Sequence, residues 1–374
     1  MAERIRRAGM VAWAVVGLAA MLALLAWAAW VVRVIWPPLI LAGAIVFILN
    51  PPVVRLARRM PRVAATALMY LAVLLGLLVV GGAVWPLASD QAEELADEWP
   101  EIEDDLKARV NDLARESEDW PIRIPTYTQI EDDLAANDDE TIQDTIARVR
   151  DVGSRVFHVA LILILAPILA FYLLVDLPRL KTVAEGLIPH DSRDEVLHVG
   201  RRLNRAIGGF FRGQLLVALI VGVMVSVGLA VIDLPFWLIV GMIAGAFNII
   251  PLVGPWVGGV PGVVIALTTR DPITAVWVVL IMAAAQQIDN HIISPVVMQR
   301  AVRLHPAAVL LALLAGGTLG GFFGLLVAVP TAAVLKILVG HLWRTYVLGE
   351  PFEEAVVEEE ADEAPSPGLV REAS

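Results

Sequence analysis

The sequence predicts an all-α, polytopic membrane protein with two broken, re-entrant helical hairpins in a core of the inverted-repeat type. Three observations lead to this prediction. Of the 374 residues, 58% are hydrophobic, and the mean hydropathy is +0.73, which is typical of a chain that crosses a membrane several times. Apolar runs of spanning length alternate with arginine-rich loops. In two places prolines and glycines interrupt an apolar run before it is long enough to cross a bilayer.

The formal net charge of −11 is distributed unevenly along the chain. Residues 89–150 include 20 acidic and 6 basic residues, and residues 348–374 include 9 acidic residues and one arginine. The remaining chain therefore has a net charge of +11. This distribution indicates a membrane body with basic loops and two acidic appendages. The chain has no cysteine, which excludes disulfides, thiolate metal sites and cysteine nucleophiles.

Residues 1–88 are predicted to form three membrane spans. Arginines near the start precede the apolar run 10–32, which places the N terminus in the cytoplasm by the positive-inside rule. A cleaved signal peptide is the alternative, but the run is longer than the usual core of such a peptide. The second span, 37–54, returns to the cytoplasm, and 63–87 crosses outward again. Four arginines mark the loop between these two spans as cytoplasmic: Arg55, Arg58, Arg59 and Arg62.

Residues 89–151 form an acidic segment that we expect outside the cytoplasm, with a helical first half. Five apolar residues recur there at helical spacing: Leu95, Ile102, Leu106, Val110 and Leu113. The acidic runs at 131–133 and 138–140 lack the spacing and glycine turn of an EF-hand. We therefore interpret them as solvated faces rather than calcium sites.

Residues 152–232 are predicted to form two spans around a basic cytoplasmic helix, 179–212. The first span ends at Asp176-Leu177-Pro178, and the second begins at Gly213. An apolar stripe on the basic helix suits the bilayer interface; it comprises Val196, Val199, Leu203, Ile207 and Phe210 or Phe211. Nucleic-acid binding is rejected as an explanation of the charge, because the segment lies between spans and carries no recognisable motif.

The transport core is predicted at residues 233–346, and its first hairpin surrounds a break at Pro251. The limb before the break would cover about 24 Å and the limb at 256–269 about 21 Å, against a hydrocarbon core of about 30 Å. A re-entrant hairpin fits these lengths better than an ordinary extramembrane turn, and Gly254 and Pro255 would form its tip. The break is rich in residues that end or bend helices: Pro251, Gly254, Pro255, Gly258, Gly259, Pro261 and Gly262.

A second interrupted run begins at Pro306, and its first limb, 306–315, is also too short to span. The residues after this limb include five glycines, which allow helices to approach closely or unwind: Gly316, Gly317, Gly320, Gly321 and Gly324. Basic residues after the run favour a cytoplasmic end. The acidic tail, 347–374, has few apolar residues and is predicted to be disordered.

Polar residues within the apolar segments are the candidates for chemistry. Gln286, Asn290 and Ser294 are spaced by four residues and share one helix face, with Asp289 beside them. Such groups are costly inside a membrane and would line a hydrophilic path. Alternatively, Asp289 is paired with Arg300 or Arg303 at the cytoplasmic end of the span. Asn248 precedes the first break, where its amide would satisfy unwound backbone or contact a substrate.

No enzymatic constellation is found in the sequence. The six histidines are scattered without metal-ligand spacing, and no Walker loop is present. We therefore expect no enzymatic activity, no metal and no cofactor. Transport energy would come from an ion gradient or from the gradient of the substrate itself.

Three stretches, in this order, resemble the autoinducer-2 exporter family of bacterial transporters. The first is the Pro-x-x-Gly-Pro break that follows an asparagine-bearing helix, here from Asn248 to Pro255. The second pairs Asn290 with Pro295, and a Leu-His-Pro sequence follows at 304–306. The third is a glycine-rich run from Gly316 to Gly324 that closes in Val329-Pro330. The acidic segment and the tail are not covered by these motifs.

The resemblance implies a transporter of the bacterial inner membrane that works by an elevator-like shift of its hairpin core. It also implies a homo-oligomer, with a pentamer as the form that the family suggests. Both termini would be cytoplasmic, in agreement with the arginine distribution. Some family members are linked to export of autoinducer-2, a small polyhydroxylated furanone, and others to exchange of sodium or lithium for protons.

Three functional hypotheses follow from these observations. The first is a secondary exporter of a small polar metabolite or signalling molecule, because the neutral amides of Asn248, Gln286 and Asn290 suit hydroxyl groups. The second is a cation/proton antiporter that uses Asp289 as the exchange carboxylate. The third is a membrane scaffold without transport activity, whose acidic external segment recruits a partner. The expected partners are thus a small polar solute or a cation and proton, the lipid bilayer, and further copies of the chain.

Overall fold

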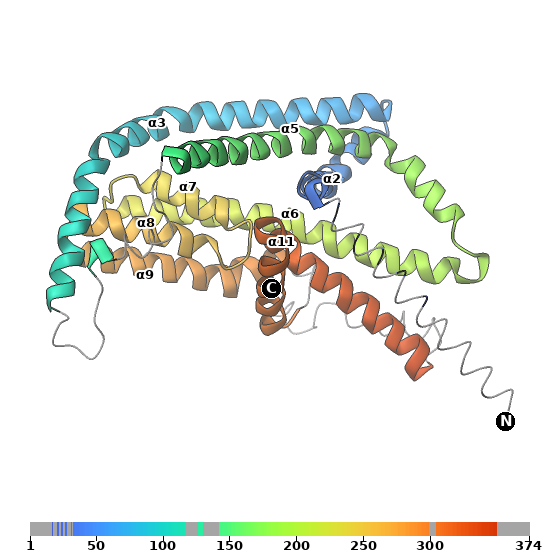
Figure 1. Cartoon of the computed structure of the whole chain (residues 1–374). Helices are drawn as coiled ribbons and strands as arrows, with labels where there is room; N and C mark the ends of the chain where they lie inside the picture. Colours follow the sequence, from blue (N-terminus) through green and yellow to red (C-terminus); the bar gives the residue numbers. More distant parts are fainter. Residues whose placement is uncertain are drawn as a thin grey trace, which may run out of the picture.

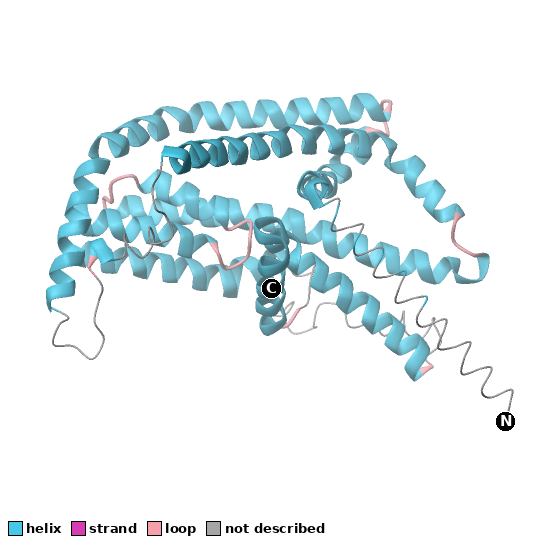
Figure 2. Ribbon diagram, in the orientation of Figure 1, coloured by secondary structure: helices cyan, strands magenta, loops and turns pink. Residues whose placement is uncertain are grey.

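The computed structural model describes residues 33–116, 126–129, 142–298 and 304–349, with isolated positions between 17 and 31. Within these residues every regular element is a helix, which confirms the predicted all-α class (Figures 1 and 2). The predicted acidic runs, the predicted C-terminal tail after Gly349 and most of the predicted first span lie outside the described residues. Six described helices are long and apolar enough to cross a bilayer, so the chain is a polytopic membrane protein: Trp36–Leu56, Arg62–Asp112, Phe157–Gly186, Arg193–Val231, Pro272–Val297 and Pro306–Thr345.

Helix α2 spans Trp36–Leu56 and matches the predicted second span, with Pro51 and Pro52 inside the helix. A proline inside a helix has no N–H group, so the carbonyl four residues earlier loses its partner. For Pro51 this carbonyl belongs to Phe47. Arg212 of helix α6 donates a hydrogen bond from Nη1 to the Phe47 oxygen at 2.9 Å. The neighbouring helix thus satisfies the acceptor that the proline frees.

Helix α5 spans Ile142–Gly186, so the helix continues past Asp176-Leu177-Pro178, where the first of the two spans in 152–232 was predicted to end. Pro178 frees the carbonyl of Leu174. The Arg62 guanidinium donates to that carbonyl from Nε at 2.6 Å, and its Nη2 donates to Asn50 Oδ1 at 2.9 Å. Arg62 therefore joins the start of helix α3 to both α2 and α5. The sequence could not show this, because the partners of Arg62 come from other helices.

Loss of the hydrogen bond between Arg62 and the Leu174 carbonyl should destabilise the protein, and replacement of Pro178 should partly reverse this effect. Arg62→Met leaves the buried Leu174 carbonyl without a donor, which should lower the free energy of unfolding by about 1–3 kcal/mol. The double variant Arg62→Met/Pro178→Ala restores an N–H four residues after Leu174 and should recover part of that loss. Thermal unfolding in detergent measures both effects. Arg58→Met is the matched control, because the side chain of Arg58 is exposed and makes no hydrogen bond or ion pair with any described residue. Equal stability of the two single variants would contradict this account.

Helix α3 spans Arg62–Glu116 without interruption. The sequence predicted a span followed by a separate amphipathic helix, and the structure joins them. Its 55 residues extend over about 82 Å, so α3 must project well beyond a hydrocarbon core of about 30 Å. We call residues 87–116 the α3 arm. Figure 1 shows α3 curving over the molecule, with the arm passing the ends of α7 and α8. The first part of α3 contacts α5, where the Tyr70 hydroxyl donates to the Pro167 carbonyl at 2.8 Å.

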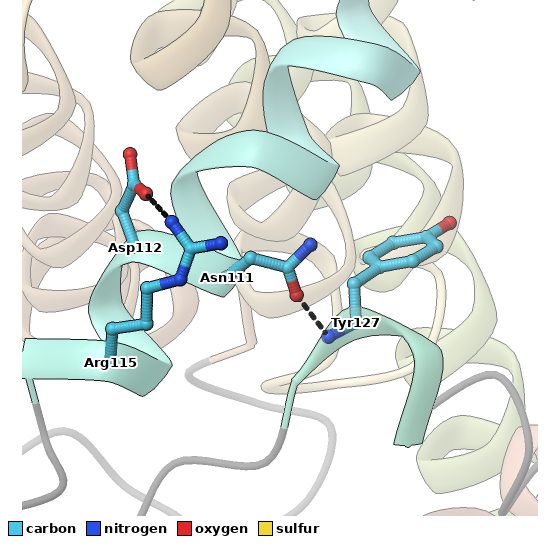
Figure 3. A network of polar contacts seen from close by, with 4 residues as sticks. All are labelled: Asn111, Asp112, Arg115 and Tyr127. Atoms are coloured by element: carbon cyan, nitrogen blue, oxygen red, sulfur yellow. Dashed lines mark hydrogen bonds and ion pairs between the residues drawn. The ribbon is translucent and has the colours of Figure 1, made fainter.

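The far end of the α3 arm binds the short described stretch 126–129 (Figure 3). Asn111 Oδ1 accepts a hydrogen bond from the Tyr127 N–H at 3.0 Å. The ammonium group of Lys107 lies 5.4 Å from the centre of the Tyr127 ring, a cation–π distance. Arg115 pairs with Asp112 on the same helix at 3.4 Å. The two contacts of Tyr127 hold the stretch 126–129 against the far end of the α3 arm.

The predicted basic helix, 179–212, is divided between two helices: residues 179–186 end helix α5, and residues 193–212 begin helix α6, which spans Arg193–Val231 and includes the following span. The expectation that its apolar stripe faces the bilayer interface was wrong for most of the stripe. Phe210, Phe211 and Val199 are buried inside the protein, and the rings of Phe47 and Phe211 stack 6.2 Å apart. The cause is α2 and α11, which cover this face of α6. Of the residues in the predicted stripe, only Val196 is exposed.

The first predicted break separates two short helices. Helix α7 spans Trp237–Phe247, residues 248–253 form a turn, and helix α8 spans Gly254–Thr269. At 11 and 16 residues they cover about 16 and 24 Å, less than the hydrocarbon core. Helix α9 (Pro272–Ile288) then leads through the π-helical turn η4 (Asp289–Ile293) into α10 (Ser294–Met298). One apolar core joins α6, α7, α8 and α9.

The second predicted break is also present, inside helix α11 (Pro306–Leu342). Gly321 has φ +55° and ψ −137°, which is not helical and which only glycine adopts without strain. A Cβ on Gly316 would meet the backbone of Gly324 and the side chain of Ala328. Residues 8 and 12 positions apart are far from each other in a straight helix, so the chain folds back at Gly321 into a second hairpin (Figure 1). A further helical segment, η5 (Trp343–Leu348), follows.

The two hairpins meet in a second apolar core. Ile250, from the turn between α7 and α8, is almost fully buried there with Leu313 and Leu326 from the two limbs of α11. Phe210 of α6 and Ala44 of α2 complete this core. The turn of the first hairpin is therefore held between the second hairpin and the spanning helices.

Candidate functional site

Asn248 stands at the end of α7 and joins the first hairpin to its surroundings. The last carbonyl groups of a helix have no partner within that helix. Here the backbone carbonyl of Asn248 accepts a hydrogen bond from Gln214 Nε2 of α6 at 2.5 Å. Asn248 is completely buried and Gln214 is only 3% exposed. The side chain of Gln214 thus satisfies the backbone at this helix end, and the side-chain amide of Asn248, which was predicted to do so or to contact a substrate, binds another side chain instead.

The side chain of Asn248 contacts the carboxylate of Asp289. Asn248 Nδ2 donates to Asp289 Oδ2 at 3.3 Å, and Ser294 Oγ donates to Asp289 Oδ1 at 2.6 Å. Asp289 is 3% exposed. In a regular α-helix residues 289 and 294 would point in different directions. The π-helical turn η4 widens the helix here, so that a side chain five residues on comes over Asp289.

We call Gln214, Asn248, Asp289 and Ser294 the tip cluster. Three side chains of the cluster donate hydrogen bonds, and each binds an oxygen atom of another cluster member: the amides of Gln214 and Asn248 and the hydroxyl of Ser294. Two of its buried acceptors, Gln214 Oε1 and Asn248 Oδ1, have no hydrogen-bond partner among the described residues. The cluster therefore has a surplus of acceptors. It can bind a group that donates hydrogen bonds, or a cation, and it disfavours an anion.

The charge of Asp289 makes this surplus stronger. The structure gives Asp289 no ion pair with any described residue, and Arg300 and Arg303, its predicted alternative partners, lie outside the described residues. A buried carboxylate that has only neutral donors is costly to keep ionised. A cation, a proton or a donating solute would lower that cost.

The structure divides the polar face predicted at 286–294 into two parts. Gln286 Nε2 donates to Asn290 Oδ1 at 2.9 Å, so these two residues bind each other. Asn290 is exposed and Gln286 is half-buried, whereas Asp289 is buried. Ser294, predicted on the face of Gln286 and Asn290, contacts Asp289 instead because of the π-helical turn. Gln286 and Asn290 therefore lie beside the tip cluster and outside it.

The predicted tip of the first hairpin is displaced by a few residues. Pro251 lies in the turn, as predicted, but Gly254 and Pro255 form the first residues of α8. Within the turn, Leu252 has a left-handed backbone conformation, with φ +71°. Glycine is needed at position 254 because a Cβ there would collide with the carbonyl of Ala244 and the side chain of Asn248. Glycine at this position allows α8 to start directly against the end of α7 and the tip cluster.

The glycines of the second hairpin have separate places. Gly316 is at the close approach of the two limbs, and a Cβ on Gly317 would touch Leu325. Gly321 makes the kink, while Gly320 has open space around it. They shape the hairpin that covers the turn of the first one. Within the described part of the chain, no three His, Asp or Glu side chains gather as metal ligands.

Gln214 was missed by sequence reasoning, although a signal was present. It is an uncharged polar residue near the start of an apolar run that extends from 213 to 232. The same kind of signal drew attention to Asn248. The interval of 34 residues between the two gives no indication that they meet.

Comparison with known proteins decides the family. The family model described as AI-2E family transporter matches residues 18–344 of this chain. The chain belongs to the AI-2E transporter family. This confirms the resemblance drawn from the three sequence motifs.

Relatives within the AI-2E family cover most of this chain. The candidate transport protein YrrI of Bacillus subtilis is 32% identical over 326 residues, covering 84% of this chain and 88% of its own. YueF, another candidate transport protein of Bacillus subtilis, is 30% identical over 303 residues, covering 80% and 82%. The candidate permease PerM of Escherichia coli is 27% identical over 315 residues, covering 82% and 86%. These AI-2E relatives are named as transporters and permeases, which fits a membrane transporter and not an enzyme.

Proposed function

We propose that this AI-2E family protein is a secondary transporter that exports a small polar solute, of the autoinducer-2 kind, through the tip cluster. The observation that carries the proposal is the position of that cluster. It lies at the break between two helices that are each too short to span a bilayer, against the second hairpin. Broken helices of this kind hold the binding sites of many secondary transporters.

The chemistry of the cluster favours a hydroxylated solute. Asn248 Oδ1 and Gln214 Oε1 are buried acceptors without a partner among the described residues, and both would gain a hydrogen bond from a hydroxyl group. Leaving such acceptors unpaired costs about 1–3 kcal/mol each. A solute with several hydroxyl groups would offset that cost, and an analogue without them would not.

The movement would be a shift of the first hairpin as one body. The core that joins α6 to α9 makes them a single packed unit, so a displacement of α7 and α8 would carry the tip cluster with it. In the proposed elevator-like mechanism, both hairpins are re-entrant and enter from opposite faces of the membrane. The turn at 248–253 would open toward one side and then toward the other.

A second candidate function is sodium or lithium exchange for protons. The observation that favours it is Asp289, the one buried acid among the described residues. Its carboxylate, the Ser294 hydroxyl and the two free amide oxygens are the hard oxygen ligands that small cations prefer. Proton and cation would then compete for the same carboxylate.

Purified protein in sealed vesicles separates these functions. We expect a labelled hydroxylated furanone to leave these vesicles faster than it leaves protein-free vesicles, and the efflux rate should saturate at high furanone concentration. A sodium or lithium gradient that drives a pH change inside the vesicles would instead support the antiporter. Vesicles in which neither solute moves would contradict both transport functions and favour the remaining hypothesis, a scaffold that acts through its acidic segment.

The proposed setting is the bacterial inner membrane, with cytoplasmic termini and the α3 arm on the opposite side. Exposed apolar side chains cover both faces of the first part of α3, including Leu77, Leu78 and Val79. These would contact lipid or further copies of the chain. A homo-oligomer, with a pentamer as its proposed form, would bury part of this surface.

A further inference from the structure

The start of helix α7 lacks an N-terminal cap of its own. The first N–H groups of a helix need acceptors from outside it, and a side chain at the N-cap position usually supplies one. In α7 the N-cap residue is Phe236, whose side chain has no acceptor. Phe236 also has φ +58°, a left-handed conformation that costs energy for an aromatic residue. This end of the first hairpin is therefore held by groups from elsewhere in the chain.

The missing cap comes from the α3 arm. Gln91 Oε1 accepts a hydrogen bond from the backbone N–H of Leu238, in the first turn of α7, at 3.2 Å. The two residues are separated by 147 positions. Gln91 is only 8% exposed, although it follows the spanning part of α3. An acceptor at this position is favourable because the N-terminal end of a helix carries partial positive charge.

Apolar contacts hold the arm at the same place. Ile102 is 3% exposed and belongs to the core that contains Leu234, Phe236 and Val240, and Leu95 packs against that core. Gln91, Leu95 and Ile102 recur at spacings of four and seven residues, so they share one face of the arm. The sequence predicted this apolar face without showing what it would cover.

The turn before α7 is also fixed from α8. Asp233 has φ +50°, and its carbonyl accepts a hydrogen bond from Arg270, just after α8, at 2.9 Å. The strained turn is thus held on one side by Arg270 and on the other by the arm. Because α7 is a single short helix, any shift of its first turn reaches Asn248 at its other end.

We propose that Gln91 is a positioning residue for transport, through which the α3 arm sets the position of α7 and of the tip cluster. The first part of α3 is bound to α5 by Tyr70, while the arm is bound to α7 and α8. Pro86 lies between these two parts and interrupts the hydrogen bonding of α3. The arm therefore connects the α2–α5 body to the hairpin body across a weak point in one helix. This inference rests on the proposed function, in which the hairpin body moves during transport.

Three variants of the full-length protein test the role of Gln91. Gln91→Met keeps the length of the side chain and removes the acceptor. Gln91→Glu keeps the acceptor and adds a charge that suits the helix N-terminus. Glu94→Met is the matched control, since Glu94 is exposed on the same arm. Hydrogen exchange of the peptide 236–243 reports the contact itself, and solute efflux from vesicles reports its consequence.

In Gln91→Met we expect exchange in this peptide to rise about 2- to 10-fold, the range that corresponds to one lost hydrogen bond. The maximal rate of efflux should fall by a similar factor, with little change in the solute concentration at half-maximal rate. Gln91→Glu should restore both quantities, and Glu94→Met should leave them unchanged. Unchanged exchange in Gln91→Met, or no rescue by Gln91→Glu, would overturn the inference. If exchange responds as expected but the wild type moves no solute, the arm contact stands and the proposed function fails.

Discussion

Asp289→Asn is expected to reduce transport at least about tenfold while leaving the protein inserted and folded. Asparagine has nearly the same volume, but it cannot ionise. Its NH₂ group replaces one carboxylate oxygen and would face the donor of either Ser294 or Asn248, with which it cannot form a hydrogen bond. One hydrogen bond to a charged group is therefore lost, at a cost of about 1.5–3 kcal/mol. About 1.4 kcal/mol corresponds to a factor of ten in affinity. Efflux from vesicles, at matched amounts of protein verified by size-exclusion chromatography, measures the effect.

Two further variants show which property of Asp289 matters. Ser294→Ala keeps the carboxylate and removes one donor at 2.6 Å, so it should weaken transport less than Asp289→Asn. Asn290→Ala changes an exposed residue outside the tip cluster and should be close to neutral. If Asp289→Asn transports normally, the tip cluster is not the binding site. If its efflux is lost together with all cation-driven pH change, Asp289 belongs to a coupled exchange.

Much of the fold follows from the sequence, because apolar run length and arginine position are local signals. The span at α2, the two breaks and the amphipathic face of the α3 arm could all be predicted in this way. The ends of helices were predicted less well. Pro178 indicated the end of a span, yet Arg62 of another helix satisfies the carbonyl that this proline frees, and the helix continues. Such compensation depends on the tertiary structure and leaves no local pattern.

The sequence predicted individual residues of the site, but it did not predict the contacts between them. Asn248 and Asp289 were both selected because polar groups are costly in apolar segments, but nothing in their spacing of 41 residues indicates a hydrogen bond. The π-helical turn at η4 moves Ser294 from one face to another, and a straight-helix projection cannot show this. The cap that Gln91 provides for α7 was also beyond the sequence, since the partner is a backbone N–H group.

Gly254→Val is expected to block transport and to destabilise the first hairpin. A Cβ at Gly254 would overlap the carbonyl of Ala244 and the side chain of Asn248, and backbone on one side cannot move without separating α7 from α8. Overpacking of this kind costs about 1–3 kcal/mol. The shift would also displace Asn248 from Asp289. The rate of transport should therefore fall by more than the decrease in the amount of folded protein explains. Gly254→Ala already adds the colliding atom and should give a partial effect of the same sign.

Gly259, five residues later on α8, provides the matched control. A Cβ there would meet only Met282, at an ordinary contact distance of 3.5 Å. Gly259→Ala should therefore be neutral or more stable by up to about 1 kcal/mol, because alanine favours the helix. Opposite signs at the two glycines would show that the close start of α8 against Asn248 is required, and not glycine in α8 generally. If Gly254→Val is as stable and active as Gly259→Ala, then the contact between α7 and α8 at the tip cluster does not determine transport.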